Sequence, residues 1–201
     1  TRTRPDISYA QSAVSALAAR DPSRALMLGK RGLRYLAGAT DVGLEFRPGG
    51  GDFTAYCDAS FEAHRSTTGS VATYCGCVLA RRSAKQPQVA KSTADSEVTA
   101  LAATVSMAEN VRALLESMYV PVHSMSVGCD NQACIILSTG EGSHKTKALA
   151  NRAYYVREMV KLGQLVIFYI VTDEQKADVL TKFLVAMKMK AARRQLCLVR
   201  A

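Results

Sequence analysis

Between residues 53 and 90, short runs of apolar and β-branched residues alternate with polar turns. Three such runs follow one another and predict three strands, because β-branched and aromatic residues favour extended backbone. The polar connections between them are short, which favours an antiparallel meander. The three predicted strands cover residues 53–58, 69–79 and 81–90.

Beyond residue 90, apolar positions recur with helical spacing, and two more strand-like runs interrupt them. Residues 93–118 place apolar side chains on one face of a long helix, with Ser92 or Thr93 as its N-cap. This succession of elements predicts a mixed α/β fold in which two strands are reached by crossovers. The further strands are predicted at 122–129 and 165–171, and the further helices at 131–139, 147–162 and 174–190.

The first 46 residues predict a helical appendage. Residues 6–19 carry apolar positions at helical spacing with Asp6 as the N-cap, and Asp21-Pro22 opens a second helix that ends at Gly38. The clearest break in the chain is Arg-Pro-Gly-Gly-Gly at 47–51. We therefore predict a helical appendage at 1–46, an α/β domain at 47–184 and a basic C-terminal helix or tail at 185–201.

Two of the predicted strands end in Cys-Asp, which places Asp58 and Asp130 at strand ends. Taken alone, such an acid is also a common turn former. Two further acids, Glu97 and Asp178, stand on predicted helices. Four carboxylates in these positions suit a site for divalent cations, because Mg²⁺ prefers oxygen ligands and a pair of ions can clamp a phosphoryl group.

Four motifs surround these acids: Tyr-Cys-Asp-Ala-Ser at 56–60, the segment 85–97, Cys-Asp-Asn-Gln-Ala at 129–133 and Ala-Asp-Val-Leu-Thr-Lys at 177–182. Their types and order resemble the ribonuclease H domain of copia-type (LTR) retrotransposon polyproteins, over roughly residues 45–184. Residues 3–10 and 30–38 resemble the end of the reverse transcriptase that precedes that domain. The resemblance implies a ribonuclease H-like α/β fold, with a mixed five-stranded sheet of order 3-2-1-4-5 flanked by helices.

The resemblance also implies a chemistry. Asp58, Glu97, Asp130 and Asp178 would hold two Mg²⁺ ions, which Mn²⁺ can replace. Glu97 is favoured over Asp95 because in the family the ligand is the acid followed directly by an apolar residue; the helix dipole explains Asp95. The implied reaction is endonucleolytic hydrolysis of the RNA strand of an RNA–DNA hybrid, which leaves 5′-phosphate and 3′-hydroxyl ends. The implied protein partner is the reverse-transcriptase region of the same polyprotein.

Six residues are candidates for contacts with the hybrid. Asn131 and Gln132 are placed to reach the minor groove of the RNA strand, although a helix N-cap and first turn explain them equally well. Lys145 and Lys147 are candidates for phosphate contacts. The full set is Ser92, Thr93, Asn131, Gln132, Lys145 and Lys147.

The formal charge of +9 is concentrated at the two ends of the chain. Residues 1–46 hold seven Lys/Arg against four Asp/Glu, residues 182–201 hold six against none, and residues 47–181 are neutral. A basic surplus of this kind suits sequence-independent contact with phosphates, and a solvated tail or a protein-binding segment explains it equally well.

The six cysteines form no zinc-binding pattern and are typical of reduced thiols in an intracellular protein. We expect the cytoplasm, retroelement particles or the nucleus, and no membrane, because no run of 18 apolar residues occurs. Cys75 and Cys77 are predicted to share one strand face. The resemblance implies that the first and fourth strands are parallel neighbours. Because side chains alternate along a strand, Cys57 and Cys129 should then be buried next to each other, opposite Asp58 and Asp130.

The sequence therefore predicts a metal-dependent ribonuclease H as part of a retroelement reverse transcriptase. One alternative is a domesticated, non-catalytic element that uses the basic flanks to hold nucleic acid or a larger assembly. Another is a transposase- or integrase-like nuclease, which shares the fold and the metals but not the Ala-Asp-Val-Leu-Thr-Lys motif. Four retained acids argue against a non-catalytic scaffold, because clustered like charges destabilise a fold that has no use for them.

Overall fold

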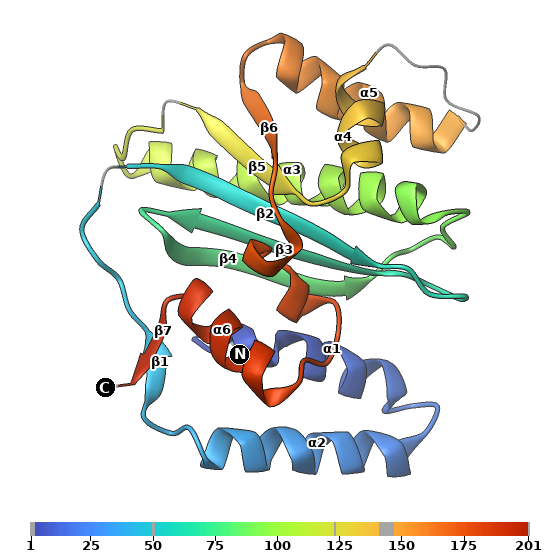
Figure 1. Cartoon of the computed structure of the whole chain (residues 1–201), viewed down its shortest axis with the longest axis vertical. Helices are drawn as coiled ribbons and strands as arrows, with labels where there is room; N and C mark the ends of the chain where they lie inside the picture. The colour runs from blue at the N-terminus through green and yellow to red at the C-terminus, as the bar shows by residue number, and fades with distance from the viewer. Residues whose placement is uncertain (1–2, 50, 123, 141–146, 201) are drawn as a thin grey trace.

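The computed structural model describes residues 3–49, 51–122, 124–140 and 147–200. A five-stranded mixed sheet forms its centre (Figure 1), in the order β4-β3-β2-β5-β6. The strands are β2 (Phe53–Ser60), β3 (Thr67–Tyr74), β4 (Cys77–Lys85), β5 (Met125–Cys129) and β6 (Leu165–Tyr169). Strands β4, β3 and β2 are antiparallel, and β5 and β6 run parallel to β2. This arrangement confirms the predicted order 3-2-1-4-5.

One face of the sheet is covered by α3 (Thr93–Ser117), with α4 (Gln132–Thr139) and α5 (Lys147–Lys161) packed beside it. Alternate residues of β2 and β5 fill the core between the sheet and these helices. Cys57 and Cys129 are register partners in adjacent strands, and both are fully buried free thiols. The prediction that these two cysteines lie side by side in the core is confirmed.

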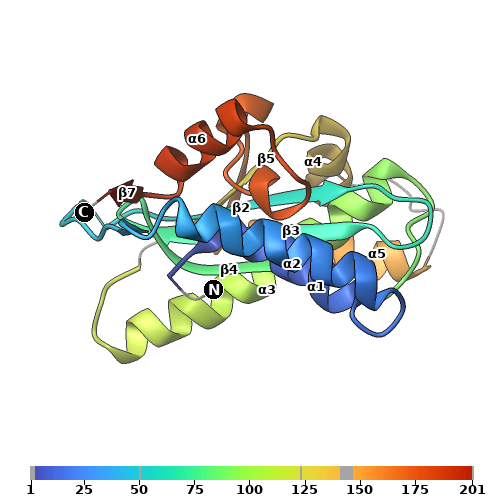
Figure 2. The ribbon, with the colours of Figure 1, turned by 90° about the horizontal axis from the view of Figure 1, so that it is seen from below.

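The opposite face is covered by segments from both ends of the chain. These are η1 (Pro5–Ile7), α1 (Ser8–Leu17), α2 (Pro22–Ala37), β1 (Val42–Leu44), α6 (Ala186–Gln195) and β7 (Leu198–Arg200). Strands β1 and β7 pair antiparallel and tie the two ends together. Figure 2 shows α6 and α3 on opposite sides of the sheet. The division of the chain at residues 46 and 184 stays a prediction.

The N-terminal helices differ from prediction in one respect. Asp21 caps α2, since its carboxylate accepts a hydrogen bond of 3.0 Å from the Arg24 backbone N–H, as predicted. Asp6 is not the N-cap of α1. It lies inside η1, where its buried carboxylate accepts hydrogen bonds from the Arg4 guanidinium and the Tyr35 hydroxyl. A long-range charge network therefore takes the place of a local cap.

The predicted helix over residues 174–190 is wrong. The chain instead forms two single 3₁₀ turns, η2 (Thr172–Glu174) and η3 (Asp178–Leu180), before α6 begins at Ala186. The side-chain amide of buried Gln175 donates to the Cys57 carbonyl at 2.9 Å, which fixes the turns to the end of β2. Val179 and Leu180 are buried in a second core between the sheet and the terminal segments.

The turn between β3 and β4 also differs from the prediction, which placed it at Ala80-Arg81. It lies at Cys75-Gly76, where both residues have positive φ angles of 51° and 76°. Two consecutive residues with positive φ are typical of a tight two-residue hairpin, and glycine favours this conformation. Cys75 therefore lies in the turn and Cys77 begins β4, so the two do not share one strand face.

A glycine allows η3 to lie directly on the sheet. Gly69 pairs with Asp58 in the β2–β3 register. A Cβ at Gly69 would lie 2.7 Å from the Ala177 carbonyl oxygen and 2.8 Å from Cγ2 of Thr181. These distances are shorter than ordinary contacts, so any side chain at residue 69 would push η3 away from Asp58.

We predict that Gly69→Ala destabilises the protein by about 1–3 kcal/mol, the usual cost of forcing extra atoms into a packed core. Gly29→Ala is the matched control, because Gly29 lies in α2 with open space around it. That change should be neutral or add up to about 1 kcal/mol. Urea unfolding of both variants measures the difference. Equal stabilities would show that η3 does not pack on Gly69.

No helix among the described residues is long and apolar enough to span a membrane.

Candidate active site

Three carboxylates from three different elements converge at one edge of the sheet. Asp58 lies near the end of β2, Glu97 in the first turns of α3, and Asp130 directly after β5. Each offers an oxygen atom, and these three oxygens all lie within 4.8 Å of one another. Asp58 and Glu97 are only 7% and 5% exposed. Clustered, buried carboxylates of this kind form a candidate site for a divalent cation.

The strand register brings Asp58 and Asp130 together. Because Cys57 pairs with Cys129 in parallel strands, the residues that follow them lie side by side, with Asp58 still inside β2 and Asp130 just after β5. Glu97 reaches that edge because the first turn of α3 is held in place. Ser92 caps the helix by accepting from the Asp95 N–H at 3.1 Å, and buried Gln86 donates to the Ser96 carbonyl at 2.8 Å.

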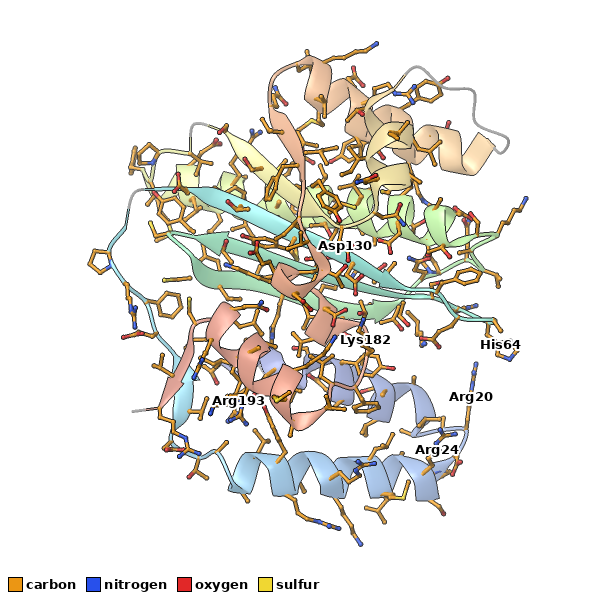
Figure 3. All side chains as sticks on the ribbon, viewed as in Figure 1. Arg20, Arg24, His64, Asp130, Lys182 and Arg193 are labelled. Carbon is orange, nitrogen blue, oxygen red and sulfur yellow. The ribbon has the colours of Figure 1, made fainter. Side chains whose placement is uncertain are left out.

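Asp178, the fourth predicted acid, lies beside the three-carboxylate cluster rather than inside it. It is the first residue of η3, and its carboxylate forms an ion pair with Lys182. Its charge nevertheless acts on Asp58 and on Asp130. The structure thus brings three of the predicted acids together. It places the fourth, Asp178, at their border, where its carboxylate is paired with Lys182. Asp130 and Lys182 are labelled in Figure 3, where Lys182 lies below Asp130 in the view.

Two residues that sequence analysis did not assign contact the acids directly. The Thr181 hydroxyl donates to the Asp58 carboxylate, and the Thr172 hydroxyl donates to Asp130 at 3.2 Å. Thr181 and Lys182 both belong to the Ala-Asp-Val-Leu-Thr-Lys motif. The opposite charges of Asp178 and Lys182, four residues apart, were the one local signal for their contact. The Thr181 contact with Asp58 spans 123 residues and has no local signal.

Of the six residues predicted to contact nucleic acid, the structure describes four in full. Asn131 caps α4 by accepting from the Cys134 N–H at 2.9 Å, and the exposed Gln132 begins that helix beside Asp130. Ser92 and Thr93 are exposed at the start of α3, and Ser92 serves as its cap. Lys145 lies outside the described residues, as does the side chain of Lys147, which begins α5. Contact with nucleic acid stays a prediction for all six.

Comparison with known proteins finds matches among curated sequences and solved structures, but no family model matches. The chain is 33% identical over 187 residues to a retrovirus-related Pol polyprotein from transposon TNT 1-94 of Nicotiana tabacum, which covers 90% of the chain. It is 31% identical over 190 residues to the corresponding polyprotein from transposon RE2 of Arabidopsis thaliana. The chain is a homologue of the Pol polyproteins of copia-type transposons. It spans 13–14% of the length of these two relatives.

The solved structures agree on the fold of this Pol homologue. LC11-RNase H1, crystallised in complex with an RNA/DNA hybrid, superposes with a TM-score of 0.51 at 17% identity and covers 64% of the chain. The superposition spans 93% of that ribonuclease. The fold is therefore ribonuclease H-like, as the sequence predicted.

Burial raises the pKa of each clustered acid, and repulsion within the cluster adds to the shifts of Glu97 and Asp58. Loss of solvent raises the pKa of Glu97 to about 9, and the Asp58 charge adds to the shift. Burial also raises the pKa of Asp58 to about 6, although the hydrogen bond from Thr181 acts against it. The pKa of Asp130 is raised mainly by burial. At neutral pH the cluster therefore retains protons that exposed acids would have lost.

The donor set of this Pol homologue fits a divalent cation. Oε2 of Glu97 is buried without any hydrogen-bond partner among the described residues. A buried carboxylate oxygen without a partner costs free energy unless a cation satisfies it. Carboxylate oxygens are also the ligands that Mg²⁺ and Mn²⁺ prefer. The residues present therefore fit the predicted metal.

The raised pKa values predict how stability depends on pH when metal is removed with EDTA. A carboxyl group with a higher pKa in the folded than in the unfolded state stabilises the fold while it is protonated. For Glu97 this stabilisation is lost as the pH rises from about 4.5 towards about 9. We predict that Glu97→Gln is more stable than wild type at pH 8 and that its melting temperature changes less between pH 5 and pH 9.

Thermal melts of the metal-free protein measure this effect, with Glu158→Gln, an exposed glutamate of α5, as the matched control. The control should melt like wild type at each pH. A Glu97→Gln variant that is less stable than wild type at pH 8 would contradict the assignment, because it would show that the Glu97 charge is satisfied within the protein.

Proposed function

We propose that this chain is a metal-dependent endonuclease that hydrolyses the RNA strand of RNA–DNA hybrids, as part of a retroelement reverse transcriptase. The observation that carries the proposal is the convergence of Asp58, Glu97 and Asp130 on a ribonuclease H-like fold, with a buried Glu97 oxygen that lacks a partner. The coordination chemistry favours Mg²⁺, with Mn²⁺ as a substitute.

Asp58, Glu97 and Asp130 would hold one cation, and Asp58 with Asp178 a second. Bound there, divalent cations would lower the pKa of a water molecule and neutralise the charge that develops on the scissile phosphate. The protein's own part is to hold these oxygens in place. Thr181 fixes the Asp58 carboxylate, and Thr172 fixes that of Asp130.

Lys182 is a cation at the border of the acid cluster, and its charge acts on Asp58. Its ammonium group pairs with Asp178, and that contact raises the pKa of Lys182 against the opposing effect of burial. The side chain is 50% exposed. Lys182 therefore neutralises part of the acidic charge while it can still turn towards a substrate phosphate. It acts as a positioning residue for Asp178 in this proposal.

The hybrid is the substrate that this edge of the sheet suits best. Gln132 and Asn131 lie beside Asp130, where polar side chains can reach 2′-hydroxyls and base edges in a shallow minor groove. Ser92 and Thr93 are exposed at the start of α3, the helix that carries Glu97. A structural relative of the same fold was crystallised with an RNA/DNA hybrid. The products expected from a paired-metal site are 5′-phosphate and 3′-hydroxyl ends.

The protein context supports the same proposal. The matching relatives are Pol polyproteins, and the chain covers only a small part of each. Residues 1–46 resemble the end of a reverse transcriptase and pack against the sheet face that carries η3. We infer that the reverse-transcriptase region of the same polyprotein is the natural partner of this chain.

The proposal predicts that wild-type protein cuts a labelled RNA–DNA hybrid with Mg²⁺ or Mn²⁺ and not with EDTA. Asp58→Asn and Asp130→Asn should each reduce cleavage by about 10²-fold or more, because each removes a ligand charge and keeps its shape. Both variants should fold. Gel analysis of the labelled RNA strand measures the rates.

Asp95→Asn is the matched control. Asp95 lies in the first turn of α3, two residues from Glu97, and its carboxylate accepts from the Lys91 N–H at 2.9 Å. It is not part of the cluster. This change should leave cleavage within about a few-fold of wild type and cost only the cap energy of about 1 kcal/mol. Wild-type protein that binds the hybrid and leaves it intact with either metal would favour the non-catalytic scaffold.

A further inference from the structure

A groove with a volume of about 1070 Å³ lies between α2 and α6, on the sheet face that carries η3. Helix α2 packs against α1, and α6 packs against η1 and β7, so the two helices form opposite walls. Their facing sides contribute Arg31 from α2 and Lys190 and Arg194 from α6. Most residues that line the groove therefore come from the two ends of the chain, and Val179 and residues 182–184 complete the lining.

The lining of the groove combines apolar side chains with six basic residues and one acidic residue. Arg31, Lys190 and Arg194 are exposed, and none has an ion-pair partner among the residues that the structure describes. The one acidic residue of the lining is Asp6, whose side chain is fully buried. Arg4 and Arg193 neutralise it at 2.9 Å and 3.5 Å. The groove thus presents unpaired positive charge to solvent.

The floor of the groove is held rigidly. The Tyr35 ring is covered by the guanidinium groups of Arg193, at 4.5 Å from the ring centroid, and of Arg4, at 5.7 Å. The Tyr35 hydroxyl donates to Asp6 and accepts from Arg193 at 2.7 Å. These residues come from η1, α2, α6 and the chain just before η1. Their mutual contacts link α2 to α6 and hold the two walls at a fixed separation. The groove is therefore formed without a ligand.

The groove is continuous with the acid cluster. Lys182 contributes to its lining and also pairs with Asp178. The next residue, Phe183, lies in the lining with 59% of its surface exposed. Its ring meets the edge of Tyr9 at a centroid distance of 4.8 Å, which holds an apolar face towards solvent. Figure 3 shows Asp130, Lys182 and Arg193 following one another from the acid cluster to the groove.

We propose that this groove binds a single strand of nucleic acid that extends from the hybrid held at the acid cluster. Unpaired cations along a groove, with an exposed aromatic ring at its entrance, are the features that bind a phosphate backbone and stack a base. The proposal rests on the proposed function, because it takes the acid cluster as the place where the hybrid lies. The strand would pass from the cluster over Lys182 and Phe183 to the groove cations.

Fluorescence anisotropy in EDTA, where no cleavage takes place, tests the groove. The first probe is a labelled blunt RNA–DNA hybrid. The other probes are the same hybrid with one single-stranded extension, which is placed on the RNA or the DNA strand and at one end or the other. We expect wild type to bind one of the extended hybrids about tenfold more tightly than the blunt one. The triple variant Arg31→Gln, Lys190→Gln, Arg194→Gln should lose this preference. For the extended hybrid, the slope of log affinity against log salt concentration should become shallower by about two. Each lost phosphate contact on a single strand accounts for about 0.7 of this change.

The matched control is Lys30→Gln, Arg34→Gln, Lys188→Gln. These residues are exposed on the same two helices, lie outside the groove lining and carry the same total charge. The control triple should keep the preference for the extended hybrid. Equal losses in both triples would show a general effect of charge and overturn the proposal. A wild type that binds all extended hybrids no better than the blunt one would also overturn it.

Phe183→Ala separates stacking from charge. The variant should weaken binding of the extended hybrid and leave its salt slope unchanged, because no phosphate contact is lost. An unchanged affinity would remove Phe183 from the proposed path of the strand. Cleavage of the blunt hybrid by wild type with Mg²⁺ is scored separately. Absence of that cleavage would contradict the proposed function, whereas loss or retention of the preference for an extension reports on the groove alone.

Discussion

The burial of like charges beside one another is the constraint on which the rest of this structure depends. Burial raises the pKa of Asp58, Glu97 and Asp130, repulsion within the cluster adds to it for Asp58 and Glu97, and both effects weaken the metal-free fold. The fold tolerates this because packing beneath the acids and hydrogen bonds from Thr181 and Thr172 hold them in place. The buried residues Cys57 and Cys129 are register partners in the strands that carry Asp58 and Asp130. A bound cation would turn the same repulsion into attraction.

The two ends of the chain complete the site from the other face of the sheet. Val179 and Leu180 are buried together with Leu196 and Leu198 near the C-terminus and Val42 near the N-terminus. This second core presses η3 onto Gly69, and Thr181 and Lys182 follow directly. Segments from the two ends of the chain therefore hold the border of the acid cluster in place. The same segments form the basic groove, so cleavage and strand binding would share one support.

Local sequence patterns predicted the strands and placed Asp58 and Asp130 at their ends, because alternating apolar residues followed by small polar ones depend only on neighbouring positions. The strand order followed from the resemblance to the ribonuclease H family. The first strand runs two residues further than predicted, to Ser60. They failed where distant contacts decide the backbone. The helix expected over 174–190 has suitable apolar spacing, but Gln175 bonds to the Cys57 carbonyl, 118 residues away, and the chain turns instead. The turn at Cys75-Gly76 was missed because an apolar run continues through it. The support that Thr181 gives to Asp58 arises only in the folded chain.

The most direct test of this account is the anomalous scattering of Mn²⁺ bound in crystals of the protein. The account predicts a peak about 2.1 Å from oxygens of Asp58, Glu97 and Asp130. A second peak is expected between Asp58 and Asp178, with the Lys182 ammonium displaced from its ion pair. A well-ordered acid cluster that binds no Mn²⁺ at millimolar concentration, with Lys182 still paired to Asp178, would contradict the central claim that these carboxylates are gathered to hold metal.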